Sequence, residues 1–357
     1  MVAKKEIEGE EMDEMVDDKK ESVDDVLEET TIDGDDFDYV DIKDLPGVGA
    51  TIASKLKGAG YVDIIALATA NPKDVSEVCD IGEPTSRKII AEAREAAKMN
   101  FLSGVEFEDK RKAVQRISTG SQAFDILLGG GVETQAITEC YGEFGSGKSQ
   151  LAFQLAINVQ LPKEKGGLEG HAIWIDTEGT FRPARIEQIA LAKGLDPKQT
   201  LQNIKIGRAY SSDHQILLVD KIPELINKDP KIRLIVVDSM MALFRAEYVG
   251  RGTLADRQQK VNVILHNLQR IADRFNVAVY MTNQVMARPD MMFGDPTAPV
   301  GGHIIGHVAT YRVYLRKGKK GMRVAKLVDS PSMPEGEATF VVTSDGIVDA
   351  EEEGKKK

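Results

Sequence analysis

The 357-residue sequence lacks any apolar run long enough to cross a membrane. No stretch approaches the roughly 18 consecutive apolar residues that a transmembrane helix needs. The opening residues, "MVAKKEIEGEEMDEM", also lack the apolar core of a secretory signal peptide. These absences argue against a membrane protein or a membrane partner, and we expect a soluble protein in the cytoplasm.

Cysteine is scarce as well. The two cysteines, Cys79 and Cys140, lie far apart in the sequence and without the spacing of metal ligands. This pattern argues against a disulfide scaffold and against a zinc site. The remaining composition is that of a soluble globular protein, and 357 residues are enough for two domains.

A surplus of basic charge, the usual mark of a nucleic-acid-binding protein, is missing too, because the net charge is −11. Residues 1–38 hold 17 Asp plus Glu and 4 Lys, so this segment carries −13 and the rest of the chain +2. With little apolar content, residues 1–38 are expected to form an acidic disordered tail. Such a tail could keep the protein soluble, compete with DNA for basic surfaces, or have no specific role. Residues 350–357 are expected to be a second charged tail.

Residues 142–149, "GEFGSGKS", fit the G-x-x-x-x-G-K-[ST] pattern of a phosphate-binding loop between an apolar strand-like run and a helical run. Glycines in such a loop let successive backbone N–H groups face a phosphate at a helix N-terminus. Lys148 is expected to reach the β- and γ-phosphates, and Ser149 to ligate Mg²⁺. A plain glycine-rich turn is the alternative, but it seldom supplies the Lys-Ser pair here. The expected nucleotide-binding residues of the loop are Gly142, Glu143, Phe144, Gly145, Ser146, Gly147, Lys148 and Ser149.

The run "IRLIVVDS", residues 232–239, indicates a parallel strand that is buried on both faces and ends at Asp238. A carboxylate at this point can hold hydrated Mg²⁺ through a water molecule. The alternative, an aspartate that only caps the following helix, is weaker when a phosphate loop lies upstream.

After Gly120, apolar strand-like runs alternate with helical patterns. This alternation predicts an α/β fold with a mostly parallel central sheet between helices, followed by antiparallel strands. The phosphate loop then lies at the carboxyl edge of the sheet, where such folds bind ligands. The expected strands are "AITECY" (136–141), "HAIWID" (171–176), "NIKIGRA" (203–209), "RLIVVD" (233–238), "VAVYMTN" (277–283), "ATYRVYLRK" (309–317), "MRVAKLVD" (322–329) and "TFVVTSDG" (339–346).

A small helical domain is expected before the core, over residues 39–98. The stretch "LPGVGATIASKLKGAGY", residues 45–61, resembles a helix-hairpin-helix motif, and residues 78–98 resemble a degenerate second copy. Glycine-containing hairpins of this kind expose backbone N–H groups that can hold a DNA phosphate without reading sequence. A helical bundle that serves only protein contacts is the alternative.

Residues 99–117 are expected to link the two domains, and they carry Phe101 after the preceding helix has ended. An exposed phenylalanine on a linker usually packs on its own domain. It could also anchor an extended segment against the sheet edge of a neighbouring molecule.

Several motifs in the right order together resemble the RecA and Rad-type DNA strand-exchange family, and within it the archaeal RadA recombinases. The resemblance covers about residues 38–349 and is far more specific than a lone phosphate loop. It implies a RecA-like P-loop ATPase core over residues 118–349, preceded by the helix-hairpin-helix domain. The motifs are "STGSQAFDILLGGGVETQAITECYGEFGSGKSQLAFQLA", "WIDTEGTFRPARI", "FRAEYVGRGTLADRQQ", "TNQVMARPD" and "GGHIIGHVATYRVYLRKG".

The resemblance assigns roles around the nucleotide. Glu178 would orient and polarise the attacking water, Arg185 would stack on adenine, and Gln284 would sense the γ-phosphate. Glu178, Lys148 and Gln284 are thus the expected catalytic residues. Asp329, in "VDSPSMPEGEA", resembles a residue that faces ATP across a subunit interface through cations, with K⁺ as a possible ion besides Mg²⁺. His307 could link that site to the long stretch of residues 285–307, although a histidine at the foot of a strand is more often structural.

Two segments look like the DNA-binding loops of this family, residues 245–258 and residues 285–307. The second is long, poor in periodicity and rich in Pro and Gly, as functional loops often are. Neither loop has the polar variety expected for reading sequence, which favours single strands bound without sequence preference. The expected DNA-binding residues are Arg245, Arg251, Gly252, Arg257, Arg288, Gly301 and Gly302.

The activity implied is that of a DNA-dependent ATPase that forms helical filaments, or rings, of identical subunits on single-stranded DNA. It would pair homologous double-stranded DNA and exchange strands in recombinational repair. Phe101 would insert into the next subunit, in "FLSG", where the commoner family pattern has Ala in place of Gly104. Two alternatives stay open. One is a recombinase paralogue that regulates assembly without exchanging strands, and the other is a RecA-like helicase or circadian-type phosphotransferase ring.

Overall fold

The computed structural model describes residues 41–59, 61, 64–97, 101–287, 297–301 and 303–350. The chain divides into two compact units, Met1–Leu102 and Ser103–Lys357, and each is described by itself. The predicted acidic tail and residues 351–357 lie outside the described residues. None of the helices in the described part of the chain combines the length and apolar character of a membrane span.

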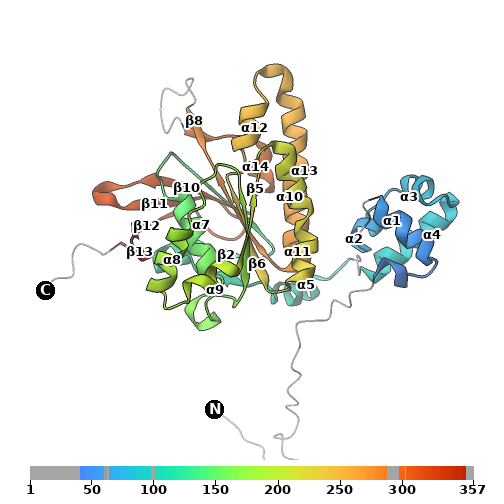
Figure 1. Cartoon of the computed structure of the whole chain (residues 1–357), viewed down its shortest axis with the longest axis horizontal. Coiled ribbons are helices and arrows are strands. Elements are labelled where there is room, and N and C mark those ends of the chain that lie inside the picture. Colours follow the sequence, from blue (N-terminus) through green and yellow to red (C-terminus); the bar gives the residue numbers. More distant parts are fainter. Residues whose placement is uncertain are drawn as a thin grey trace, which may run out of the picture. The chain divides into compact units, whose positions relative to one another are not determined.

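The first unit is helical (Figure 1). Asn71 caps one helix, with Pro72 at its first position, and Asp80 ends it in a left-handed conformation. Buried apolar side chains such as Leu56, Leu67 and Ile89 form the core of the unit. The elements are η1 (Ile42–Asp44), α1 (Ala50–Gly58), α2 (Ile64–Ala68), α3 (Pro72–Cys79) and α4 (Glu83–Ala96).

The second unit contains a nine-stranded sheet in the order β13-β12-β11-β10-β3-β7-β6-β4-β5. The pairs from β10 to β5 are all parallel, and the pairs from β10 to β13 are antiparallel. The mostly parallel sheet expected from the sequence is therefore confirmed. The strands are β3 (Ile137–Tyr141), β4 (His171–Asp176), β5 (Ile204–Arg208), β6 (Ile232–Asp238), β7 (Ala278–Asn283), β10 (Tyr311–Lys317), β11 (Arg323–Asp329), β12 (Gly336–Thr343) and β13 (Gly346–Asp349).

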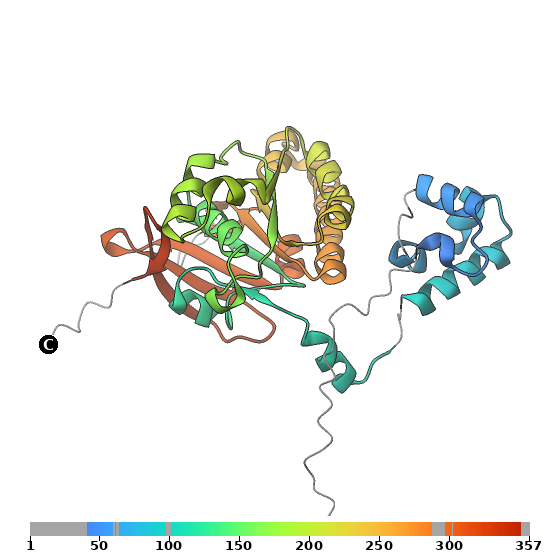
Figure 2. The ribbon, with the colours of Figure 1, turned by 60° about the horizontal axis from the view of Figure 1, so that its bottom comes forward.

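Helices cover both faces of this sheet (Figures 1 and 2). Alternate residues of the central strands enter opposite cores: Trp174 and Val236 lie in one, Ile173 and Val237 in the other. The helices of the first face are α6 (Gln122–Leu127), α7 (Lys148–Asn158), α8 (Pro183–Ala192) and α9 (Pro197–Gln202). Those of the second face are α10 (Ser212–Asp220), α11 (Ile222–Lys228), α12 (Ala242–Glu247), α13 (Leu254–Phe275) and α14 (His303–Val308).

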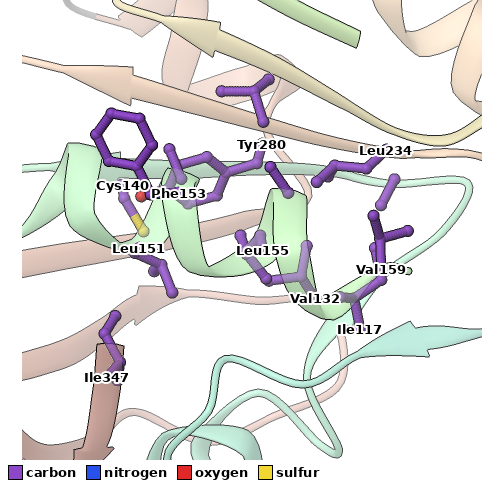
Figure 3. Packing of buried hydrophobic residues seen from close by; sticks show 14 of the residues in the cluster. Ile117, Val132, Cys140, Leu151, Phe153, Leu155, Val159, Leu234, Tyr280 and Ile347 are labelled. Carbon is purple, nitrogen blue, oxygen red and sulfur yellow. The ribbon is translucent and has the colours of Figure 1, made fainter. Parts of the chain in front are cut away.

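The helix that follows the phosphate loop, α7, is buried from Leu151 to its last residue, Asn158. Leu151 and Leu155 project into the first core together with Tyr280 of β7 (Figure 3). The Tyr280 hydroxyl donates a hydrogen bond of 2.9 Å to the carbonyl of Lys148 in the first turn of α7. This packing fixes the start of α7 against the sheet, and the phosphate loop ends at that start.

Some elements were not expected from the sequence. A Ser103 and Glu106 capping box begins α5 (Gly104–Arg111) inside the predicted linker, and Arg111 pairs with buried Glu133 at 2.6 Å. Two short antiparallel pairs also occur, one of β1 (Arg116–Ile117) with β2 (Val132–Glu133), the other of β8 (Val285–Ala287) with β9 (Thr297–Pro299). The remaining short helices are η2 (Lys163–Lys165), η3 (Arg251–Thr253) and η4 (Lys319–Gly321).

A buried ion pair joins neighbouring strands beneath the carboxyl edge of the sheet. Glu139 of β3 is fully buried, and its carboxylate accepts hydrogen bonds from Arg312 of β10 at 2.9 Å and from Asn283 of β7 at 2.8 Å. Burial raises the pKa of the Glu139 carboxyl, and the Arg312 guanidinium opposes that shift. The carboxylate therefore depends on both partners.

We predict that Arg312→Met destabilises the protein by roughly 3–5 kcal/mol, because Glu139 would be left buried without its countercharge. Arg316→Met is the matched control on the same strand, since Arg316 pairs with Glu337 at 2.9 Å on the surface and should cost less than about 1 kcal/mol. Urea unfolding of both variants measures the difference. Equal losses for the two variants would contradict a supporting role for the buried pair.

Candidate nucleotide and nucleic-acid site

The carboxyl ends of four parallel strands meet at one edge of the sheet. The register sets Asp176 of β4 beside Asp238 of β6, and Tyr141 of β3 beside Asn283 of β7. The residues that follow each of these strands therefore lie at the same edge of the sheet. This edge holds the phosphate loop and the turn that contains Glu178.

The phosphate loop connects β3 to α7, as the sequence predicts. Gly145 and Gly147 have φ of +75° and +109°, which side chains rarely allow. At Gly142 an added Cβ would lie 2.0 Å from the carbonyl oxygen of Leu315 on β10. Glycine at this position is required because another strand passes so close.

Lys148 is the first residue of α7 and points back over the loop. Its ammonium donates hydrogen bonds of 2.7 Å and 2.9 Å to the carbonyls of Gly142 and Glu143. Burial lowers the pKa of this ammonium, and the carboxylates of Asp238 and Glu178 oppose the shift. A lysine held in this way presents a positive charge at the mouth of the loop.

Asp238 lies at the end of β6 and is only 3% exposed. Its carboxylate accepts hydrogen bonds from the hydroxyls of Thr282 and Thr180. Burial raises the pKa of this carboxyl, while hydrogen bonds from Thr282 and Ser149 lower it. A carboxylate and a hydroxyl from Ser149 form the all-oxygen donor set that Mg²⁺ prefers.

Glu178 lies in the turn after β4 and meets two other strand ends. The hydroxyl of Ser239 and the side-chain amide of Gln284 both donate to its Oε1, at 2.8 Å and 3.0 Å. The structure thus brings two residues that the sequence predicted as catalytic into direct contact. The contact itself, and Ser239, were not foreseen.

Gln284 is also bonded to the predicted DNA-binding segment. Its backbone carbonyl accepts from the N–H of Val300 at 2.9 Å, and Asn283 donates from its side chain to the carbonyl of Val300 at 2.7 Å. Asn283 is the same residue that bonds Glu139. The end of β7 therefore joins the phosphate site to the base of the second loop.

The two predicted DNA-binding segments line one pocket of about 460 Å³. Arg245 and Arg257 come from the first segment and Gly301 from the second, with exposed apolar Val249 and Met286 beside them. Gly252 lies in η3, which precedes α13. Arg288 and Gly302 lie outside the described residues.

Comparison with known protein families shows to which family the chain belongs. Residues 110–350 match the Rad51 family model. The chain belongs to the Rad51 family. Residues 39–95 match a SAM-like helix-hairpin-helix tandem, so the predicted second copy of that motif agrees with this match. Rad51-family proteins are RecA-like DNA-dependent ATPases that use ATP and Mg²⁺.

Two other predicted residues of this Rad51-family chain, Arg185 and Asp329, make their contacts outside the phosphate loop itself. Arg185 of α8 donates to Gln150 at 2.9 Å and to the carbonyls of Thr343 and Ser344 in the turn between β12 and β13. Burial lowers the pKa of its guanidinium. Asp329 pairs in register with Arg312, whereas Leu315, further along β10, is the residue beside the loop.

Phe101 is fully exposed in the first unit. Its side chain therefore does not pack on its own domain, which was one of the two expectations from the sequence. Phe144, at the tip of the phosphate loop, is 95% exposed. Both large apolar side chains are free to meet another molecule.

Sequence reasoning missed Asp176. This residue ends β4 as Asp238 ends β6, so the rule that selected the second aspartate would also have selected the first. Asn283 had no such signal, because its role depends on which strands are neighbours in the sheet.

We predict that Gly142→Ala weakens ATP binding and destabilises the protein by about 1–3 kcal/mol, because its Cβ would collide with the backbone of β10. Gly104→Ala is the control, since a Cβ there meets nothing within 4 Å and its stability should be unchanged or slightly higher. Thermal unfolding with and without MgATP measures both effects. A Gly142→Ala protein that binds MgATP as wild type does would show that the close approach is unimportant.

Proposed function

We propose that this chain is an ATP-dependent DNA recombinase, of the kind found among archaeal RadA proteins. It assembles on single-stranded DNA, pairs it with homologous double-stranded DNA and exchanges strands during recombinational repair. The observation that carries this proposal is the bonded series from Glu178 through Gln284 to Val300, because it joins the phosphate site to the pocket between the two loops. A stand-alone ATPase has no need of such a connection.

The phosphate site supports hydrolysis by positioning and charge. Glu178 is aimed by two hydrogen-bond donors and supplies the acceptor that an attacking water needs. Lys148 would exchange its carbonyl partners for the β- and γ-phosphates. Mg²⁺, held by Ser149 and through water by Asp238, would neutralise charge that develops on the phosphates. Arg185 would stack on the adenine.

The DNA site is consistent with binding that ignores sequence. Arg245 and Arg257 can neutralise phosphates, and the exposed Val249 and Met286 offer apolar surface to bases. In the first unit, the N-cap residues of α1 and α4 are glycines, Gly49 and Gly82, which supply no side-chain hydrogen bond to the helix start. In α4, Pro84 has no N–H and the Thr85 N–H donates to the Gly82 carbonyl at 2.9 Å. The first turn of α1 is therefore the better candidate to hold a DNA phosphate.

Self-assembly is the third part of the proposal. Phe101 is exposed, and the edge strand β5 presents Ile206, which is 48% exposed, as apolar surface for a neighbour. Head-to-tail insertion of one into the other would build a filament or, if it closes, a ring. Asp329, which pairs with Arg312 and not with the part of β10 beside the loop of its own chain, would then face the ATP of an adjacent subunit.

We predict that Glu178→Gln lowers kcat for ATP hydrolysis about 10²- to 10⁴-fold while ATP binding is kept, because the amide is a poor acceptor for a proton. Glu187→Gln, an exposed position on α8, is the control and should hydrolyse ATP at the wild-type rate. A Glu178→Gln protein with full ATPase activity would remove this residue from the reaction.

We predict that single-stranded DNA stimulates ATP hydrolysis by the wild type and that Phe101→Glu abolishes the stimulation, because a charged side chain cannot insert into an apolar neighbour. Leu191→Glu replaces another exposed apolar residue and should behave as wild type. Strand exchange between homologous DNA molecules is measured in the same preparations. Filaments that hydrolyse ATP without exchanging strands would favour a regulatory paralogue, and ATPase activity indifferent to DNA would refute the recombinase.

A further inference from the structure

The turn that carries Glu178 is held by an aspartate with no assigned role. The Oδ1 of Asp176 accepts from the backbone N–H groups of Glu178, Gly179 and Thr180, at 3.2, 2.7 and 3.2 Å. Its Oδ2 accepts from the N–H of Phe181 at 3.3 Å. Asp176 is only 4% exposed. One buried carboxylate thus accepts hydrogen bonds from four successive backbone amides. Such bonds are stronger than those to a neutral acceptor, because the carboxylate is charged.

Arg208, the last residue of β5, completes this arrangement. The parallel register places it beside Asp176, and its Nη1 donates to the Asp176 carbonyl at 3.0 Å and to Oδ1 at 3.3 Å. The guanidinium also covers Gly179, where an added Cβ would lie 3.1 Å from Nη2. Gly179 has φ of +72°, so the turn passes under the arginine in a conformation that favours glycine.

Glu178 is therefore fixed from two independent directions. Ser239 and Gln284 hold its carboxylate, whereas Asp176 holds its backbone. The first set of contacts comes from the residues that directly follow β6 and β7, and the second from the ends of β4 and β5. A water-orienting carboxylate has to be held to within a fraction of an ångström, since a misplacement of about 1 Å can cost about 10²-fold in rate.

We propose that Asp176 and Arg208 are positioning residues for ATP hydrolysis, which fix the 178–181 turn and thereby aim Glu178 at the water. This inference rests on the proposed hydrolytic role of Glu178. Neither residue is required to touch ATP, so their loss should affect the chemical step and not the binding of ATP or DNA.

Asp176→Asn is the sharpest test because it preserves the shape of the side chain. An amide keeps one acceptor oxygen, but its NH₂ group would face backbone N–H donors and cannot replace Oδ2. Arg208→Lys keeps the charge but not the planar cover over Gly179, and Arg208→Ala removes both. Asp229→Asn is the matched control, since Asp229 bonds His171 at 2.8 Å at the opposite end of β4.

The experiment measures kcat and KM for ATP at saturating single-stranded DNA, together with DNA affinity in the presence of a non-hydrolysable ATP analogue. We expect kcat to fall about 10- to 100-fold in Asp176→Asn and Arg208→Ala, and less in Arg208→Lys. KM and DNA affinity should stay within about twofold of wild type, and Asp229→Asn should match wild type throughout.

Three results would overturn the proposal. One is a kcat within about twofold of wild type in Asp176→Asn while Glu178→Gln is inactive. The second is a loss of ATP or DNA binding as large as the loss in kcat. The third is that Arg208→Ala, with a wild-type melting temperature, keeps a kcat within about twofold of wild type. Failure of the proposed function looks different, because the wild type itself would then lack DNA-stimulated hydrolysis.

Discussion

The arrangement depends on the hydrogen bonds made at the end of β7, where Asn283 and Gln284 stand side by side. Gln284 bonds the carboxylate of Glu178, and both residues bond Val300 at the base of the second loop. These contacts exist only because β7 lies between β3 and β6 in a parallel sheet. A group that binds beside Glu178 would compete for the side chain of Gln284, and the backbone of Gln284 also holds the loop. We therefore expect binding at the two sites to be coupled.

Much of the fold follows from the sequence. The central strands are continuous apolar runs, because both of their faces enter a helix-covered core, as Trp174 and Ile173 do from neighbouring positions. The phosphate loop was identified from its glycines and from Lys148, whose functions need little more than local backbone geometry. In contrast, β8 and β9 were missed, because Pro and Gly in that stretch indicate a loop and three-residue strands leave hardly any periodic pattern.

The site was predicted residue by residue but not contact by contact. Motifs named Glu178 and Gln284, whereas their 3.0 Å hydrogen bond depends on strand order, which a sequence without a structure does not specify. Asp176 was passed over because its partners are backbone amides, and these leave no mark in residue types. Asp329 and Phe101 are a different case, because their expected partners belong to another subunit.

The coupling between the two sites can be measured directly as a linkage. Affinity for single-stranded DNA is determined with a non-hydrolysable ATP analogue and with ADP, for wild type and for Gln284→Ala. The account predicts that the analogue tightens DNA binding by wild type about 5- to 150-fold relative to ADP, and that this ratio falls close to one in the variant. An unchanged ratio in Gln284→Ala would contradict the claim that the end of β7 connects the phosphate site to the pocket between the two predicted DNA-binding segments.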